Sequence, residues 1–156
     1  MNATDYPPDL VVVACGSQKA PGPMPARDLY QSTTFRLARA AAERLAPRHG
    51  WYVLSARHGL IHPDTVTHPY DQRITFPGAI TAEQVRTQAR DLGLLTAERC
   101  VLLGPHLYAQ AARQAWPRLI APAEGQPVGY MNQTYKDIRD GRLTLADIAA
   151  RTRTYA

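Results

Sequence analysis

Polar and titratable side chains follow three apolar runs of the sequence, at positions where they could act on one ligand. The runs are LVVVACG (10–16), WYVLSA (51–56) and RCVLLGP (99–105), and the side chains that close or follow them are Ser17, Lys19, Ser55, Arg57, His58, His106 and Tyr108. Histidine titrates near neutral pH, so His58 and His106 are candidates for a general acid or base. A lysine ammonium can hold a phosphate as a point charge. The pattern favours proton transfer beside an anionic ligand.

The segment CGSQK (15–19) combines a glycine turn with hydroxyl, amide and ammonium groups. Gly16 lets a ligand approach the backbone closely, and Ser17 and Lys19 could bind its phosphate. The spacing is not that of a P-loop or of a dinucleotide fingerprint. The alternative is a plain turn after a strand, in which Cys15 packs as a small hydrophobe. Against that alternative, Lys19 is one of only two lysines among 18 basic residues.

Two predicted helices begin with polar residues. Tyr30 and Ser32 precede the first, and His106 and Tyr108 open the second. Helix N-termini carry free N–H groups and the positive end of the dipole, which favour an anion. A neutral histidine there can donate to a developing negative charge. The alternatives are that Ser32 only caps its helix, Tyr30 only covers the core and His106 only faces water.

The segment PYD (69–71) places Tyr70 beside Asp71 at the end of a long loop. A carboxylate can activate a water or stabilise an oxocarbenium-like sugar, which is the chemistry of glycosidic cleavage. Tyr70 could stack on a base. The alternative is a structural pair between Asp71 and an arginine that anchors the loop.

The histidines in the middle of that loop do not have the spacing of a metal site. His62, Asp64 and His68 match no recognised pattern of zinc ligands. His62 and His68 each precede a proline, which favours extended backbone and exposure to solvent. We therefore expect no metal and no other cofactor.

The elements that must position these residues alternate between strands and helices. Buried strands are predicted over 10–16, 51–56, 99–105 and 118–123, and helices over 32–46, 81–95, 106–116, 131–140 and 143–153, with Ser32, Thr81 and Thr144 as caps. This order predicts an α/β fold, a three-layer sandwich around a four-stranded parallel sheet. In such sheets ligands bind at the carboxyl ends of the strands. Three polar loops would converge there.

Composition bounds the class of protein. The 156 residues fit a single domain over 9–156, after a flexible leader over 1–8. The net charge of +5 favours contact with nucleic acid, although solvated helix faces in an arginine-rich chain would give the same charge. Cys15 and Cys100 have no disulfide or metal spacing. No signal peptide or membrane span is visible, so a cytoplasmic protein is expected, with no membrane partner.

The sequence also resembles a family of small bacterial and phage proteins described as a domain of unknown function. The resemblance lies in CG-x-x-K, LY-x-S-x-x-F, LSA-x-x-GL and PYD, which here include Cys15, Gly16, Lys19, Tyr30, Ser32, Ser55, Tyr70 and Asp71. The motifs occur in order over residues 10–75. The chain is also distantly similar to YaaA-like peroxide-stress proteins and to the fold of the uracil-DNA glycosylase superfamily.

The resemblance implies a nucleobase or nucleic-acid ligand, and suggests a hydrolase that cleaves an N-glycosidic bond of a modified or damaged base in DNA. Asp71 would activate water, His58 or His106 would polarise the leaving base, and Tyr30 or Tyr70 would stack on it. Ser17, Lys19 and Arg57 would hold phosphate. The GQDPYH motif of uracil glycosylases is absent from the sequence, so the role of Asp71 is a hypothesis. The alternatives are a non-catalytic protein that binds DNA or a nucleotide, and a metal-dependent hydrolase.

Overall fold

The computed structural model describes residues 7–155, which form a four-stranded mixed sheet with helices on both faces. The strand order is β4-β3-β1-β6, with β1 (Leu10–Ala14) and β3 (Trp51–Ser55) at the centre. β6 (Cys100–Leu103) and β4 (Gly59–Ile61) form the two edges. β1 runs parallel to both β3 and β6, with Val11 opposite Trp51 and Val101. The predicted α/β class and three of the predicted strands are confirmed.

The central strand is buried on both faces because its residues are apolar at every position. All five residues of β1 are buried. Val11 and Val13 pack into one core cluster, while Leu10 and Val12 pack into the other. A continuous apolar run is typical of a parallel strand covered by helices on both sides. The strand ends where Cys15 and Gly16 begin the first polar loop.

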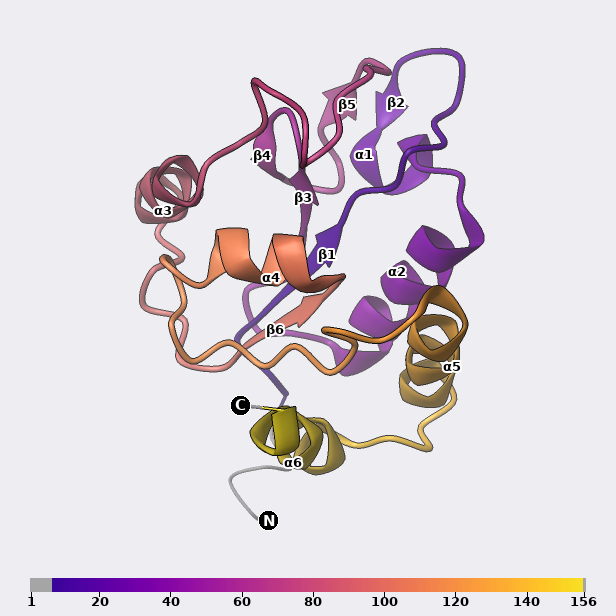
Figure 1. Cartoon of the computed structure of the whole chain (residues 1–156), viewed down its shortest axis with the longest axis vertical. Coiled ribbons are helices and arrows are strands. Elements are labelled where there is room, and N and C mark those ends of the chain that lie inside the picture. Colours follow the sequence, from indigo (N-terminus) through magenta and orange to yellow (C-terminus); the bar gives the residue numbers. More distant parts are fainter. Residues whose placement is uncertain (1–6, 156) are drawn as a thin grey trace.

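Two helical layers cover the sheet, as Figure 1 shows. α2 (Thr33–Leu45), α5 (Val128–Arg139) and α6 (Leu145–Tyr155) contribute to the cluster around Val11 and Val13. α3 (Ala82–Asp91) and α4 (His106–Ala112) contribute to the cluster on the opposite face. The three-layer arrangement is therefore confirmed.

Three of these helices begin at the residues that the sequence predicts as caps. The Ser32 hydroxyl accepts a hydrogen bond from the Phe35 N–H at 3.2 Å. Thr81 forms a capping box with Gln84 at the start of α3. The Thr144 hydroxyl accepts from the Asp147 N–H at 3.2 Å, ahead of α6. Each cap pairs an N–H group that the first turn of a helix leaves without a partner.

The expectation of an all-parallel sheet is wrong, because β4 runs antiparallel to β3, with Ser55 opposite Gly59. Gly59 has a φ of 72°, a left-handed conformation that glycine adopts without a steric penalty, and it turns the chain directly back along β3. The predicted strand over 118–123 is reduced to one parallel bridge, between Ile120 and Val101. A turn and Pro122 follow that bridge, and proline cannot donate a ladder hydrogen bond.

A second, smaller sheet lies beyond the carboxyl ends of β1 and β3 (Figure 1). It pairs β2 (Met24–Pro25) with β5 (Val66–Thr67), and α1 (Ala26–Leu29) follows β2 directly. These elements lie in segments that the sequence predicts as loops. They join the loop after β1 to the loop after β4, which brings Tyr30 and Tyr70 to the same end of the sheet.

Residues 1–6, most of the leader expected over 1–8, lie outside the described residues. Among the helices of the described residues, none is both long and apolar enough to span a bilayer.

Candidate functional site

A cavity of about 290 Å³ lies at the carboxyl ends of β1 and β6. These strands are neighbours, but α2 follows β1 onto one face and α4 follows β6 onto the other, so the chain connection reverses between them. Open α/β sheets bind ligands at such a switch point. The cavity is lined by Ala14, Cys15, Gly16, Ser17, Ser32, Thr34, Phe35, Ala38, Leu103, Gly104, Pro105, Val128, Met131 and Tyr135.

Two of the lining residues are glycines at close approaches. A Cβ atom on Gly104 would lie 2.6 Å from the Cβ of Ala14, closer than two carbon atoms can pack. A Cβ atom on Gly16 would lie 2.9 Å from the Ser32 hydroxyl oxygen. Gly16 thus allows the loop after β1 to sit against the N-terminus of α2. Both strand ends can approach a ligand through backbone alone.

A chain of three hydroxyl groups lies beside this cavity, at the carboxyl end of β3. The Tyr70 hydroxyl lies 2.6 Å from the hydroxyls of both Ser55 and Tyr30. The buried Ser55 oxygen also accepts hydrogen bonds from the N–H groups of Arg57 and His58. With both of its lone pairs used, Ser55 donates to Tyr70, which in turn donates to Tyr30.

Cys15 connects the three strand ends. Its sulfur lies 3.4 Å from the hydroxyl oxygen of Tyr108 on α4. The same sulfur accepts a hydrogen bond from the Ala56 N–H, also at 3.4 Å. Burial, together with the nearby Cys15 thiol, raises the pKa of Tyr30, Tyr70 and Tyr108. All three phenols are therefore protonated at neutral pH and can donate hydrogen bonds.

Lys19 is linked to the cavity through Ser17, which lines it. Its Nζ donates to the Ser17 carbonyl oxygen at 3.3 Å and lies 4.3 Å from the centroid of the Tyr70 ring. A cation over an aromatic face is held in place by the ring quadrupole. Among the ion pairs of the described residues, none involves Lys19. Within the described residues, the ammonium is thus oriented without a carboxylate to neutralise it.

His58 also packs against Tyr70. The two ring centroids are 5.0 Å apart in an edge-to-face arrangement. Partial burial, and secondarily the charge of Arg57, lower the pKa of His58 below 6.5. His58 is therefore neutral at physiological pH, and it can accept a proton at one ring nitrogen and donate a hydrogen bond from the other. The Arg57 side chain is exposed, and only its backbone N–H contacts the hydroxyl chain.

Two of the predicted catalytic residues lie apart from this cluster. His106 Nδ1 is 2.7 Å from a carboxylate oxygen of Glu124, which also pairs with Arg113. The hydrogen bond from the Arg113 guanidinium holds the pKa of Glu124 below its usual range, with a smaller contribution from His106. The partial burial of Glu124 acts in the opposite direction but is outweighed. Asp71 is exposed, and no hydrogen bond or ion pair involves its carboxylate among the described residues.

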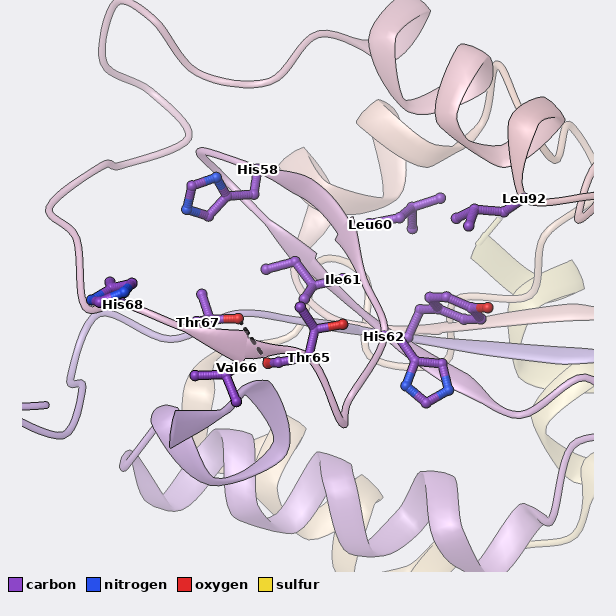
Figure 2. Close-up of a pocket in the computed structure, with 10 residues that line it drawn as sticks. His58, Leu60, Ile61, His62, Thr65, Val66, Thr67, His68 and Leu92 are labelled. Carbon is purple, nitrogen blue, oxygen red and sulfur yellow. Dashed lines mark hydrogen bonds between the residues drawn. The ribbon is translucent and has the colours of Figure 1, made fainter. Parts of the chain in front are cut away.

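A second hollow, of about 580 Å³, opens beside β4 and β5 and is drawn in Figure 2. His58, His62 and His68 line it, and their rings lie well apart in the figure. It is the larger of the two, but it is a groove on whose wall Val66 and Leu92 are 64% and 48% exposed, and the residues that line it include none from β1 or β6. We place the candidate site at the smaller cavity, where the strand ends converge.

The exposure predicted for His62 and His68 is confirmed. Among the described residues, no group of three histidine, cysteine, aspartate or glutamate side chains is placed to hold a metal ion.

The sequence does not indicate that α5 contributes to the site. Met131 and Tyr135 of α5 line the cavity, and Tyr135 is fully buried. The N-terminal half of α5 is placed against α2 by a 2.8 Å hydrogen bond between Thr34 and Asn132. These contacts join residues about a hundred positions apart, so no local pattern indicates them. Gly104 was likewise not among the predicted binding residues.

Comparisons with known proteins identify relatives without an assigned activity. Residues 10–137 match the model of a family of unknown function (DUF6884). The chain is 31% identical over 145 residues to "Uncharacterized protein YfjM" of Bacillus subtilis (strain 168), a match that covers 80% of this chain and 90% of the relative. No solved structure matches the chain. The matched segment contains every element from β1 to α4, and all of α5 except its last two residues. The chain therefore belongs to the DUF6884 family of unknown function.

Proposed function

We propose that this protein binds a nucleotide, free or within a nucleic acid, at the carboxyl ends of β1, β3 and β6. The observation that carries the proposal is Lys19, a cation without a carboxylate partner in the described residues, whose Nζ donates to the carbonyl oxygen of Ser17 on the wall of the switch-point cavity. A phosphate would supply the missing negative charge. The helix dipole at the N-terminus of α2 adds positive potential at Ser32 on the cavity wall.

The chemistry of the neighbouring groups suits a phosphorylated ligand that also carries a sugar or base. The protonated hydroxyl groups of Tyr30 and Tyr108 are hydrogen-bond donors of the kind that orient ligand oxygens. Gly16 and Gly104 allow the ligand to reach backbone groups at two strand ends. The net charge of +5 favours the approach of a polyanion.

The test is calorimetric titration of the protein with ribo- and deoxyribonucleoside 5′-monophosphates and with short single-stranded oligonucleotides. Lys19→Met is expected to weaken binding about tenfold or more, because a charged hydrogen bond contributes about 1.5–3 kcal/mol. The matched control is Lys136→Met, which removes the other lysine from an exposed position on α5. If neither ligand class binds, or if both variants weaken binding equally, the proposal fails.

A second proposal concerns the reaction: hydrolysis of the N-glycosidic bond between base and sugar. It is supported by Asp71, whose exposed carboxylate is unpaired among the described residues and directly follows Tyr70 of the hydroxyl chain. A free carboxylate can activate water, and a neutral His58 can donate a hydrogen bond that polarises the leaving base. The resemblance to the uracil-DNA glycosylase fold belongs to this proposal.

This second proposal is tested on oligonucleotides that each carry one modified or damaged base, with base release as the readout. Asp71→Asn should abolish release while it leaves oligonucleotide binding intact. If the whole panel stays uncleaved while nucleotides bind, the protein is a binding protein and the hydrolysis proposal is wrong.

A further inference from the structure

The hydroxyl group of Tyr135 is the one buried side-chain oxygen or nitrogen without a hydrogen-bond partner among the described residues. Tyr135 lies on α5 and is 0% exposed. Buried polar groups are nearly always paired, because an unpaired one has lost its hydration without compensation. An unpaired hydroxyl in an otherwise satisfied core is a position where a ligand atom can supply the missing partner.

The surroundings of Tyr135 are otherwise well paired. One residue earlier, the Thr134 hydroxyl donates to the Gln126 side chain at 3.0 Å. One turn earlier, Asn132 accepts a hydrogen bond from Thr34 of α2 at 2.8 Å. The lack of a partner is therefore specific to Tyr135 and does not reflect a poorly packed end of the helix.

Tyr135 also lines the switch-point cavity, where most other walls are apolar. Phe35, Leu103 and Met131 are among those walls, and the volume is about 290 Å³. Such walls exclude a bare phosphate, whose charge would lose its hydration there. They suit a planar ring with apolar faces and a hydrogen-bonding edge.

The protonation state of Tyr135 indicates what that edge must offer. Burial raises the pKa of Tyr135 far above neutral pH, so the hydroxyl keeps its proton. It can therefore donate, and the ligand atom opposite should be an acceptor such as a ring nitrogen or an exocyclic carbonyl oxygen.

We propose that the heterocyclic base of the nucleotide occupies this cavity and accepts a hydrogen bond from the Tyr135 hydroxyl. The inference rests on the proposed nucleotide binding and divides the ligand between two places. The phosphate lies beside Lys19, and the base lies inside, against α5. Tyr135 then determines which bases bind, whereas Lys19 determines that a phosphate is required.

The experiment compares Tyr135→Phe with Tyr130→Phe, a matched change at an exposed position on the same helix. Each variant is titrated with nucleoside 5′-monophosphates and with ribose 5-phosphate, which has no base. Tyr135→Phe should weaken binding of the preferred nucleotide about tenfold, the order expected for one buried hydrogen bond, and leave ribose 5-phosphate unchanged. Tyr130→Phe should change neither.

Purine nucleotides and their 3-deaza and 7-deaza analogues, each lacking one ring-nitrogen acceptor, provide a ligand-side test. If Tyr135 donates to one of those nitrogens, the corresponding analogue should bind the wild type and Tyr135→Phe equally.

The free energy of unfolding of each variant without ligand is measured in urea. Loss of an unpaired buried hydroxyl should leave Tyr135→Phe as stable as the wild type or more so.

The outcomes separate the two proposals. If Tyr135→Phe binds every nucleotide as the wild type does, the inference about the base is overturned while nucleotide binding stands. If ribose 5-phosphate binds as tightly as the nucleotides, the cavity holds no base and the inference is overturned as well. If neither nucleotides nor ribose 5-phosphate bind the wild type, nucleotide binding itself is wrong.

Discussion

The hydroxyl groups of Tyr70 and Ser55 lie 2.6 Å apart, at the end of β3. Ser55 closes a buried strand, whereas Tyr70 lies three residues after β5, near the start of the long loop between β5 and α3. The same Tyr70 hydroxyl lies 2.6 Å from that of Tyr30, just before α2. One phenol thus ties the returning loop to two elements at the carboxyl end of the sheet, next to the candidate site.

Removal of that phenolic oxygen should loosen the loop. Tyr70→Phe deprives the buried Tyr30 of its hydroxyl partner and Ser55 of its acceptor. We expect the free energy of unfolding to fall by about 1–3 kcal/mol, because a buried donor is left unpaired. Urea denaturation of Tyr70→Phe and of the exposed control Tyr130→Phe measures this. Equal stability of the two variants would contradict the hydroxyl chain.

Gly104 should tolerate no side chain. Gly104→Ala would bring two Cβ atoms to 2.6 Å at the switch point, so β1 and β6 would have to move apart. Overpacking of this kind costs about 1–3 kcal/mol, and we expect nucleotide affinity to fall with it. Gly22→Ala is the control, since a Cβ atom there meets no atom within 4 Å. Similar thermal midpoints for both variants would show that the strand ends are not tightly packed.

The sequence predicts the elements of this fold better than their pairing. Long apolar or amphipathic segments with capping residues, such as the helix after Ser32, are predictable because their signals are local. β4 was missed because it has only three residues, and its antiparallel direction depends on Gly59. The convergence of the strand ends is also predictable from the sequence, because the carboxyl ends of parallel strands meet at one edge of the sheet.

That rule does not predict which side chains form hydrogen bonds within the site. Cys15 and Tyr108 are 93 residues apart, and their contact depends on the direction in which α4 leaves β6. His106 carries the signal of a catalytic residue, yet the nearby Glu124 pairs with it through an interaction that no spacing indicates. Tyr135 carries no signal at all, because its distinguishing property is the absence of a partner within the described residues.

His58 should titrate below the usual range of histidine. Its pKa is lowered first by burial and then by Arg57, so Arg57→Gln should raise the pKa toward 6.5. Titration of the ring protons of His58 by NMR measures the value directly. Arg73→Gln, which removes an exposed arginine from the loop, is the control and should leave the pKa of His58 unchanged. A pKa at or above 6.5 in the wild type would contradict the described surroundings of His58.

The ion pair between Arg113 and Glu124 should make the free energy of unfolding depend on pH in the acidic range. The folded-state pKa of Glu124 is lowered from 4.5, so its contribution is present above pH 4.5 and is lost as the pH falls through the folded value. Arg113→Met should therefore be less stable than the wild type at pH 7, and the difference should shrink below pH 4.5. Urea denaturation across this range measures it. A difference that stays constant with pH would show that the carboxylate is not the group involved.

The most direct test of nucleotide binding at the carboxyl ends of the strands is a map of amide chemical shifts. The ¹⁵N-labelled protein is titrated with nucleoside 5′-monophosphates, and the perturbed amides are located in the fold. We predict that the largest changes cluster at Gly16, Ser17, Gly104 and Met131, around the switch-point cavity. Changes confined to the groove at Thr65, Thr67 and His68, or no changes at all, would contradict the assignment of the site.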